Sequence, residues 1–227
     1  MLLRKKVALV DFDGVILRNK QSLQYTVNRV EKFVSVKTGI KCEKMLKQFN
    51  TELYQSYGHT FLGLQDLGYT KSLKEFNSFV YGGDLRPFSL TDEEKKEWSR
   101  FKNNMSLLDI KVQLFSNSSP VWMSHFTNYD ETFEVTNMIS SFPDSYFSKL
   151  LKPKIDIYTT IYALYPNHDI VFIDDKLSNF RHVTYNTHWH NFWITNNSLS
   201  NNKLSHNIIT CKNLDDVTSF IKMNICD

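Results

Sequence analysis

The sequence contains no apolar run long enough to cross a membrane. Its first apolar segment, Val7 to Val10, has four residues before Asp11 interrupts it, whereas a membrane-spanning helix needs about 20. So short a run is also untypical of a secretory signal. We therefore expect a protein of the cytoplasm that has no membrane partner.

Cysteine and basic clusters are scarce as well. The three cysteines (Cys42, Cys211 and Cys226) are scattered without a CxxC pair, which is typical of a reducing compartment and argues against a disulfide framework or a zinc site. The formal net charge is only +3, without a long Lys or Arg block. This balance is compatible with an anionic small molecule, and it does not indicate a nucleic-acid partner.

The composition is that of an ordinary globular protein. With 227 residues, 41% hydrophobic and 22% charged, the chain can form one sizeable core and a smaller second domain. Apolar periodicity predicts helices over residues 22–39, 43–57, 73–81, 91–101 and 213–223, with Thr91 and Asn213 capping the last two. Short apolar runs predict strands over residues 7–10, 111–116, 169–174, 191–195 and 207–210, and the Asn/Ser-rich residues 196–205 predict a loop. The order predicts an α/β sheet domain interrupted by a helical one.

The stretch VDFDGV, residues 10–15, places two acids where the first predicted strand ends. Residues two apart in an extended chain point the same way, so Asp11 and Asp13 are expected to face one spot, and Gly14 permits a sharp turn after them. Two like charges there call for a cation, at the sheet edge where α/β proteins bind ligands. Capping of a turn is the alternative interpretation. A calcium loop is excluded, since Val15 stands where an oxygen ligand is expected and Ser22 stands where a Glu is expected.

Three other stretches place polar residues after predicted elements. Ser116 and Asn117 follow the second strand, where a hydroxyl and backbone amides can bind a phosphoryl oxygen or simply form a turn. Lys152 precedes Pro153 and is a candidate to neutralise phosphate, with Lys154 as its competitor. Asp174 and Asp175 end the third strand, where they bind a cation or cap a helix starting near Asn179.

The ordered set DFDGV, FSN, KPxxxxY and IDD resembles the haloacid dehalogenase-like superfamily of phosphohydrolases, over nearly the whole chain. The resemblance implies a Rossmann-like three-layer α/β/α core with a mainly parallel sheet, formed by residues 1–18 and 104–227. It also implies an α-helical cap domain, residues 19–103, inserted between the first and second motifs. Closure of such a cap excludes water from the site.

The resemblance also implies roles for individual residues. Asp11 looks like the nucleophile that forms an aspartyl-phosphate, and a carboxylate suits this role because it is already ionised at neutral pH. Asp13 resembles the general acid that protonates the leaving oxygen and then activates water. Ser116 and Lys152 resemble the residues that bind the remaining phosphoryl oxygens. Asp11, Asp175 and the backbone carbonyl of Asp13 are the implied Mg²⁺ ligands, with Asp174 as an outer or alternative ligand.

A narrower resemblance concerns residues 53–68, LYQSYGHTFLGLQDLG, which look similar to a segment of pyrimidine 5′-nucleotidase-type members. It implies a nucleoside monophosphate substrate, with Tyr57, His59 and Thr60 near the pocket and Asn117 as a further substrate-binding residue. This chain departs from that pattern at Gly14, where those enzymes often have Asn, and in the Ser-Asn-Ser of residues 116–118.

The leading hypothesis is therefore a Mg²⁺-dependent phosphomonoester hydrolase acting on a small phosphorylated metabolite. Phosphoryl transfer is favoured over attack on carbon because Asp13 can supply a proton to a leaving oxygen. A phosphomutase acting on a sugar phosphate and a non-catalytic binding protein of the same fold are the alternatives. The histidines at 182, 188 and 190 are expected to be surface or packing residues, and the oligomeric state is left open.

Overall fold

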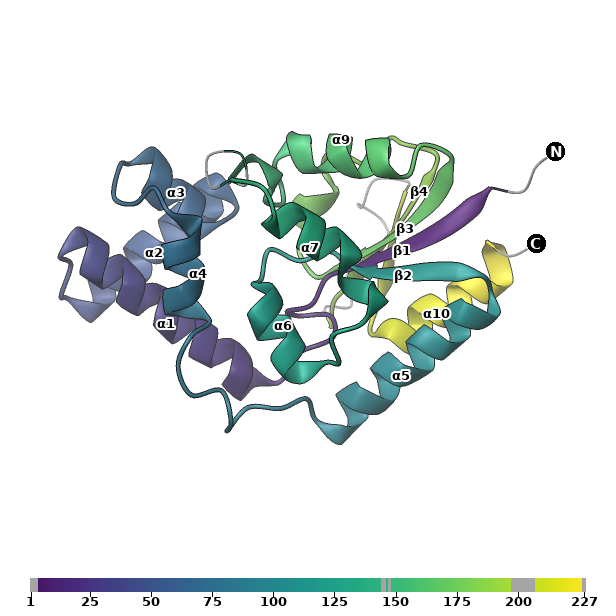
Figure 1. Cartoon of the computed structure of the whole chain (residues 1–227), viewed down its shortest axis with the longest axis horizontal. Helices are drawn as coiled ribbons and strands as arrows, with labels where there is room; N and C mark the ends of the chain where they lie inside the picture. The colour runs from purple at the N-terminus through teal and green to yellow at the C-terminus, as the bar shows by residue number, and fades with distance from the viewer. Residues whose placement is uncertain (1–3, 144–145, 147, 197–206, 226–227) are drawn as a thin grey trace.

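A five-stranded parallel sheet forms the centre of the molecule (Figure 1). The structure is a computed structural model that describes residues 4–143, 146, 148–196 and 207–225. The strands are β1 (Lys5–Val10), β2 (Ile110–Leu114), β3 (His168–Asp174), β4 (Trp189–Ile194) and β5 (Ile208–Cys211). Their spatial order is β2-β1-β3-β4-β5, and every neighbouring pair is parallel. All five predicted strands are confirmed, with small shifts at their ends.

Strand β1 shows why the sheet is covered on both faces. Val7, Ala8, Leu9 and Val10 are all completely buried. Ala8 and Val10 belong to one hydrophobic core, whereas Val7 and Leu9 belong to another, because successive side chains of a strand point to opposite faces. The continuous apolar run is thus explained by burial on two sides.

Helices pack on each face of this sheet. The core that contains Val10 also holds residues of α5 (Asp92–Leu107) and α10 (Leu214–Asn224). The core that contains Leu9 holds residues of α7 (Glu134–Ser140) and α9 (Ile155–Leu164). The result is the predicted three-layer α/β/α arrangement. Shorter elements connect these layers: α6 (Pro120–Phe126), η1 (Glu131–Phe133), η2 (Ser148–Leu150) and η3 (Leu177–Phe180).

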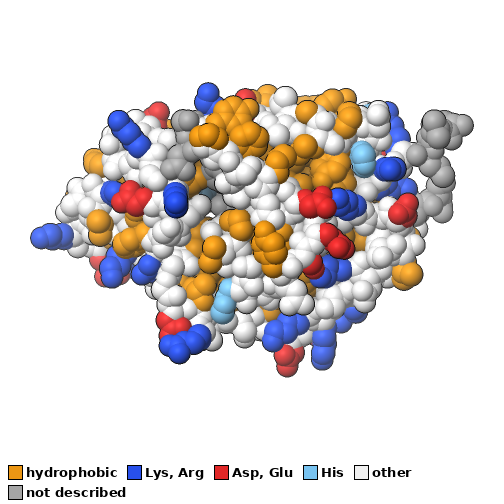
Figure 2. All heavy atoms as spheres, viewed as in Figure 1, with side chains coloured by type: hydrophobic (Ala, Val, Ile, Leu, Met, Phe, Trp, Pro, Cys, Tyr) orange, Lys and Arg blue, Asp and Glu red, His pale blue; other side chains and the backbone are white. Residues whose placement is uncertain are grey.

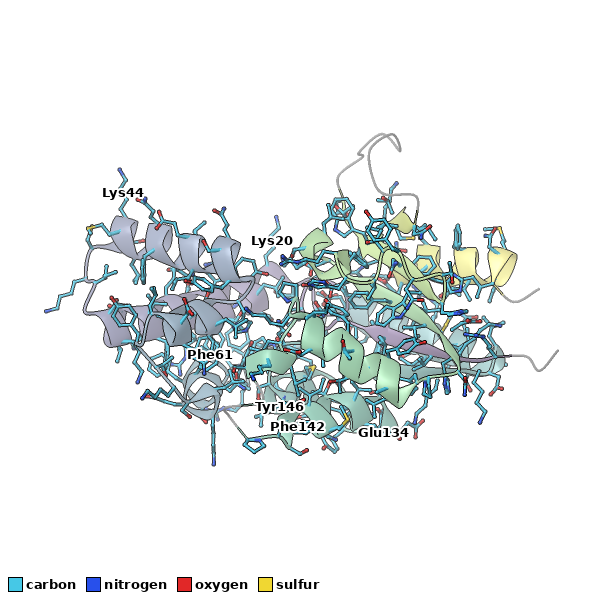
Figure 3. The ribbon with its side chains drawn as sticks, turned by 90° about the horizontal axis from the view of Figure 1, so that it is seen from above. Lys20, Lys44, Phe61, Glu134, Phe142 and Tyr146 are labelled. Atoms are coloured by element: carbon cyan, nitrogen blue, oxygen red, sulfur yellow. The ribbon has the colours of Figure 1, made fainter. Side chains whose placement is uncertain are left out.

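Four of the five helices between β1 and β2 form what we call the helical lobe. They are α1 (Lys20–Thr38), α2 (Glu43–Tyr57), α3 (Thr60–Asp66) and α4 (Leu73–Val80). Figures 1 and 3 show the lobe beside the sheet layers, beyond the carboxyl ends of the strands. Phe33, Phe61 and Phe76 pack inside it and are fully buried. The lobe therefore lies next to the edge where the sequence predicted a site.

Several local predictions are confirmed. Helix α2 spans the predicted residues 43–57. Thr91 caps α5, accepting from the amide of Glu94 while Glu94 accepts from the amide of Thr91, and the Asn213 side chain caps α10. Near Asn179 the predicted helix is only the short η3. The loop predicted over 196–205 lies outside the described residues apart from Asn196.

The boundary between core and cap stays a prediction. Helix α5, which the sequence analysis placed mostly within residues 19–103, packs against α10 and β2 of the sheet layers. None of the helices in the described ranges is long and apolar enough to cross a membrane. On the face shown in Figure 2, basic side chains are interspersed with acidic and apolar ones and form no continuous track.

Candidate active site

Three adjacent strands bring the predicted motifs to one edge. Val10, the last residue of β1, is in register with Leu114 of β2 and Ile173 of β3. The backbone amide of Asp11 donates to the carbonyl of Ile173 at 2.9 Å, so β1 and β3 stay paired up to this acid. The chain segments that leave these strands carry Asp11, Ser116 and Asp175, which line one cavity of about 220 Å³.

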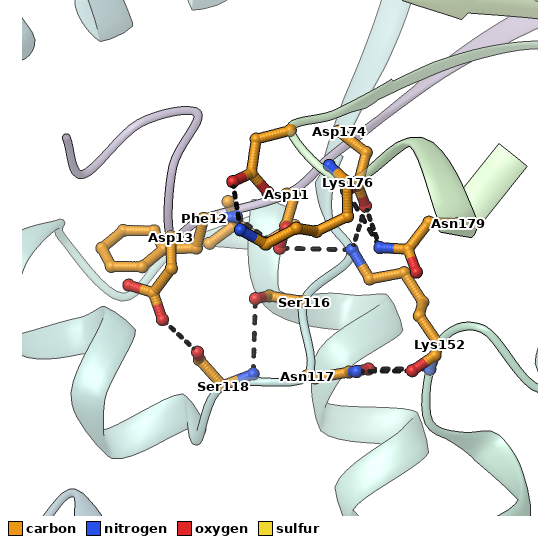
Figure 4. A network of polar contacts seen from close by, with 12 residues as sticks. Asp11, Phe12, Asp13, Ser116, Asn117, Ser118, Lys152, Asp174, Lys176 and Asn179 are labelled. Carbon is orange, nitrogen blue, oxygen red and sulfur yellow. Dashed lines mark hydrogen bonds and ion pairs between the residues drawn. The ribbon is translucent and has the colours of Figure 1, made fainter. Parts of the chain in front are cut away.

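Lys152 joins two of the acids. Its Nζ lies 3.2 Å from Oδ1 of Asp11 and 2.6 Å from Oδ2 of Asp174, and only 2% of its side chain is exposed (Figure 4). Burial lowers the pKa of Lys152, but the two carboxylates more than reverse this, so its pKa is raised and the ammonium stays charged. A buried lysine with two acidic partners is a fixed cation of the site.

Asp174 is fully buried and surrounded by donors. Besides Lys152, it accepts from Asn179 Nδ2 at 2.9 Å and from the backbone amide of Lys176 at 2.8 Å. Burial raises the pKa of this carboxyl, and the Lys152 ammonium opposes that rise. Because both its oxygens already accept hydrogen bonds, Asp174 acts here mainly to hold Lys152, and this favours the outer position that the sequence analysis considered for it.

Asp175 has one carboxylate oxygen that accepts no hydrogen bond from the described residues. Its Oδ2 lies 2.9 Å from Nζ of Lys176, while its buried Oδ1 has no hydrogen-bond partner among the described residues. Burial and the nearby Asp11 raise its pKa. Gly14 has a φ of +88°, and a β-carbon at this position would overlap the Asp175 carboxylate. The sharp turn expected at Gly14 is therefore confirmed, and the glycine is needed for space as well as conformation.

Carboxylate oxygens of Asp11, Asp174 and Asp175 lie within 4.8 Å of one another. Within the described ranges this is the only group of three or more acidic, His or Cys side chains arranged as possible metal ligands. The Asp13 side chain is not part of the group, so any contribution from this residue would come from its backbone carbonyl, as the sequence analysis expected.

Asp13 faces the same cavity but is held by other partners. Its Oδ1 accepts from Nε1 of Trp122 at 3.0 Å, and its Oδ2 accepts from the Ser118 hydroxyl. Burial raises the pKa of Asp13 to about 6, although these two donors oppose the rise. A carboxyl group with a pKa in this range can hold a proton and give it up near neutral pH, which general acid-base chemistry requires.

Asn117, in the segment that follows β2, holds the backbone of Lys152 in place, which the sequence did not reveal. Asn117 does line the cavity, but its side chain donates to the Lys152 carbonyl and accepts from the Lys152 amide, each at 2.8 Å. This pair of bonds fixes the backbone that carries the buried ammonium. Ser116 Oγ accepts from the amide of Ser118 at 3.3 Å, and Ser116 lines the cavity.

The helical lobe supplies the other side of the cavity. His59 and Thr60 line it as predicted, and the Thr60 hydroxyl donates to Asn50 Oδ1 at 2.8 Å. Burial lowers the pKa of His59 to about 4, and its Nδ1 accepts from the Phe61 amide, so the ring is neutral with its proton on Nε2.

The prediction for Tyr57 needs correction. Tyr57 is not among the residues that line the cavity, and its hydroxyl donates to Asp66 Oδ2 at 2.8 Å. Tyr54, one helical turn earlier in α2, lines the cavity in its place. The physical reason is that Tyr57, the last residue of α2, packs on α3, where its ring lies beside Gly63 and its hydroxyl bonds Asp66. This contact between two helices could not be derived from the motif.

Sequence reasoning also missed Lys176, Ser118, Trp122 and Tyr81. Lys176 directly follows the acidic pair, so its position was visible, whereas the others depend on how α4 and α6 meet the sheet. The Tyr81 hydroxyl lies 3.3 Å from Ser118 Oγ, and the Tyr81 ring packs against Trp122. These contacts connect the lobe to the partners of Asp13.

The three clustered histidines have local contacts away from this site. Nδ1 of His188 lies 3.3 Å from Asp169, and the His182 ring lies 5.8 Å from that of Tyr158. Burial lowers the pKa of His190. These contacts support the expected surface and packing roles.

Comparison with known proteins identifies the fold. No protein-family model and no curated protein matches the sequence. One similar solved structure, from Burkholderia xenovorans LB400, is described as a "putative haloacid dehalogenase-like hydrolase". It shares 11% sequence identity with this chain and has a TM-score of 0.51, and the match covers 97% of this chain and 98% of the other. The chain therefore shares the α/β fold of that structure over nearly its full length.

Proposed function

We propose that this protein is a Mg²⁺-dependent phosphomonoester hydrolase of the haloacid dehalogenase-like superfamily that works through an aspartyl-phosphate. One observation carries the proposal. Asp11, Asp175 and the fixed ammonium of Lys152 converge at the end of a parallel sheet, while the separately held Asp13 has a pKa of about 6. This arrangement supports a nucleophile, a metal position and a proton donor within one cavity.

The residues fit the proposed metal. Mg²⁺ prefers oxygen ligands and keeps several waters, and the buried Oδ1 of Asp175 has no hydrogen-bond partner in the described part of the chain. We assign Asp11, Asp175 and the backbone carbonyl of Asp13 as its protein ligands, and Asp174 as the residue behind them. When bound, Mg²⁺ lowers the repulsion between the anionic nucleophile and the anionic phosphate and orients the two.

The chain's own residues account for the remaining chemistry. An oxygen of Asp11 attacks phosphorus, the bond from phosphorus to the ester oxygen breaks, and Asp13 gives its proton to that leaving oxygen. Asp13 then takes a proton from water, which attacks the phosphorus of the aspartyl-phosphate and releases phosphate and Asp11. Lys152 and Ser116 bind phosphoryl oxygens and stabilise charge during both displacements.

We propose a small phosphorylated metabolite as the substrate. The cavity of about 220 Å³ lies below the range of about 300–1,000 Å³ that pockets for drug-sized ligands occupy. A nucleoside 5′-monophosphate remains the specific candidate, supported by the resemblance of residues 53–68 and by the presence of His59 and Thr60 in the cavity lining. The absence of a CxxC pair among the scattered cysteines supports activity in a reducing compartment such as the cytoplasm.

The test is phosphate release by the full chain from a panel of esters. The panel contains nucleoside 5′-monophosphates, sugar phosphates and p-nitrophenyl phosphate, each with MgCl₂ and with EDTA. We expect Mg²⁺-dependent release from at least one ester, and a loss of at least about 1,000-fold in Asp11→Asn. Asp156→Asn, an exposed acid in the first turn of α9, is the matched control that keeps activity.

Two outcomes would contradict the proposal. An isomerised sugar phosphate with little free phosphate would identify a phosphomutase. If no ester in the panel releases phosphate although the protein binds Mg²⁺, a binding protein of the same fold would be favoured.

A further inference from the structure

The two lysines beside the acidic cluster are held very differently. Lys152 is 2% exposed and contacts two carboxylates, so its ammonium has no room to leave. Lys176 is 49% exposed, and its Nζ contacts one carboxylate, Oδ2 of Asp175, at 2.9 Å. Figure 4 shows that the two side chains reach the cluster from different segments of the chain. Lys176 is therefore the movable cation of the pair.

The partner of Lys176, Asp175, is the acid of this cluster that has an oxygen available to bind a metal. Asp175 contributes one oxygen to the group of carboxylate oxygens that lie within 4.8 Å of one another, and its buried Oδ1 has no hydrogen-bond partner in the part of the chain that the structure describes. Mg²⁺ prefers oxygen ligands, and these carboxylates gather such ligands at one place. The Lys176 ammonium stands next to that position and repels any divalent cation that enters it.

We propose that Lys176 competes with Mg²⁺ for Asp175 and, once displaced, binds the phosphoryl group of the substrate. This inference rests on the proposed function and assigns a further substrate-binding residue to it. Lys176 acts as a temporary counter-ion of the metal-free site and as a phosphate ligand in the loaded one.

The cavity beside Lys176 can accept its ammonium after that group leaves Asp175. The Lys176 side chain already lines the cavity, together with Tyr54 of α2 on the lobe side. The nearby Asp175 and its hydrogen bond to the lysine outweigh the effect of burial and raise the pKa of Lys176, so the group is a cation at neutral pH. After Mg²⁺ takes Asp175, the strongest remaining attraction for this ammonium is the dianionic phosphate that enters the same cavity.

The experiment measures Mg²⁺ binding to the full chain by titration calorimetry, without substrate. Lys176→Met is compared with the wild type, with the charge-preserving Lys176→Arg, and with Lys154→Met, which removes an exposed lysine that does not line the cavity. We expect Lys176→Met to bind Mg²⁺ about fivefold more tightly, as loss of a partly exposed ion pair allows. Lys176→Arg and Lys154→Met should stay near the wild-type affinity.

A second titration uses inorganic phosphate at saturating MgCl₂. Lys176→Met should then bind phosphate about fivefold more weakly than the wild type, which is opposite in direction to its effect on Mg²⁺. Unchanged or weaker Mg²⁺ binding in Lys176→Met would overturn the competition, and unchanged phosphate binding would overturn the second role. Either result leaves hydrolysis by the wild type intact, whereas a wild type that neither binds Mg²⁺ nor releases phosphate would refute the proposed function and this inference together.

Discussion

Two side chains hold the carboxylate of Asp13 in place. The Ser118 hydroxyl and the Trp122 indole both donate to its carboxylate, and burial raises its pKa to about 6. Hydrogen bonds of this kind fix the direction in which a proton can be delivered. They also keep the carboxyl group from turning towards the lysines, whose positive charge would lower its pKa.

Removing one of these donors tests the role of Asp13. In Ser118→Ala, Asp13 keeps only the bond from Trp122, so we expect kcat to fall about tenfold with an alkyl phosphate. The loss should be smaller with p-nitrophenyl phosphate, whose leaving group needs little protonation. Ser124→Ala, which removes a half-buried hydroxyl in α6 that donates to the Val121 carbonyl, is the control. Equal losses with both substrates would contradict an acid role for Asp13.

Gly14 links backbone conformation to the metal position. A β-carbon there meets the Asp175 carboxylate, and the φ of +88° is unfavourable for other residues. We expect Gly14→Ala to lose about 1–2 kcal/mol of stability and its thermal response to Mg²⁺.

Gly39→Ala separates these two effects. Gly39 has a similar φ of +78°, but nothing lies within 4 Å of the added carbon. This variant should lose stability alone and keep the increase in Tm that Mg²⁺ produces. If Gly14→Ala also kept it, the close packing of Gly14 against Asp175 would be irrelevant to the metal site.

Among the elements, the turn between α2 and α3 connects the lobe to the site. Gly58 lies in this turn with a φ of +76°, and a β-carbon on it would overlap the ring of Pro153, the residue after Lys152. The lobe therefore rests directly on the segment that carries the buried ammonium.

This contact yields a prediction for catalysis. Gly58→Ala should push the α2–α3 turn away from Pro153 and lower kcat/KM about 10- to 100-fold, because small displacements of positioned groups are costly. Gly68→Ala, at a φ of +78° with open space around it, controls for backbone strain. Steady-state kinetics that show equal effects in the two variants would rule out a functional contact between the turn and Pro153.

The elements also show what could be predicted from the sequence. Strand β1 was identifiable because burial on both faces demands a continuous apolar run, and α5 because a Thr91 cap and an acidic first turn mark its start. The convergence of Asp11, Asp174 and Asp175 followed from the rule that parallel strands present their carboxyl ends at one edge. Their catalytic roles stay predictions.

The site residues that sequence analysis placed wrongly or missed depend on packing between distant elements. Tyr54 and Tyr57 are about one turn apart in α2, and Tyr54 lines the cavity while Tyr57 is held by its contacts with α3. Trp122 reaches Asp13 across 109 positions of the chain, and no local pattern reports such a contact. Sequence periodicity predicts which face of a helix is buried. It does not predict which other element that face packs against.

For the molecule as a whole, binding of Mg²⁺ should depend on pH. Burial raises the pKa of Asp13 to about 6 and also raises those of Asp174 and Asp175. These groups keep protons in the metal-free folded protein that the unfolded chain has lost, so their contribution to stability declines as pH rises from about 4 through their raised pKa values. Ionised carboxylates bind Mg²⁺, and the metal offsets this loss.

The increase in Tm caused by Mg²⁺ should therefore be larger at about pH 8 than at about pH 5. The low pKa of His59, about 4, has the opposite effect on stability, but it acts with and without metal and cancels in the difference. Thermal unfolding at both pH values, with MgCl₂ or EDTA, gives the measurement. Asp175→Asn should abolish the increment, and an increment independent of pH would contradict the assigned ligands.

The most direct test of the account is the mass of the protein during turnover. We expect acid quenching of a reaction with Mg²⁺ and an accepted phosphate ester to trap one added phosphoryl group, and peptide mapping to place it on Asp11. Asp11→Asn should carry none. A phosphoryl group on another residue, or turnover in Asp11→Asn at the wild-type rate, would contradict the assignment of this carboxylate as the nucleophile.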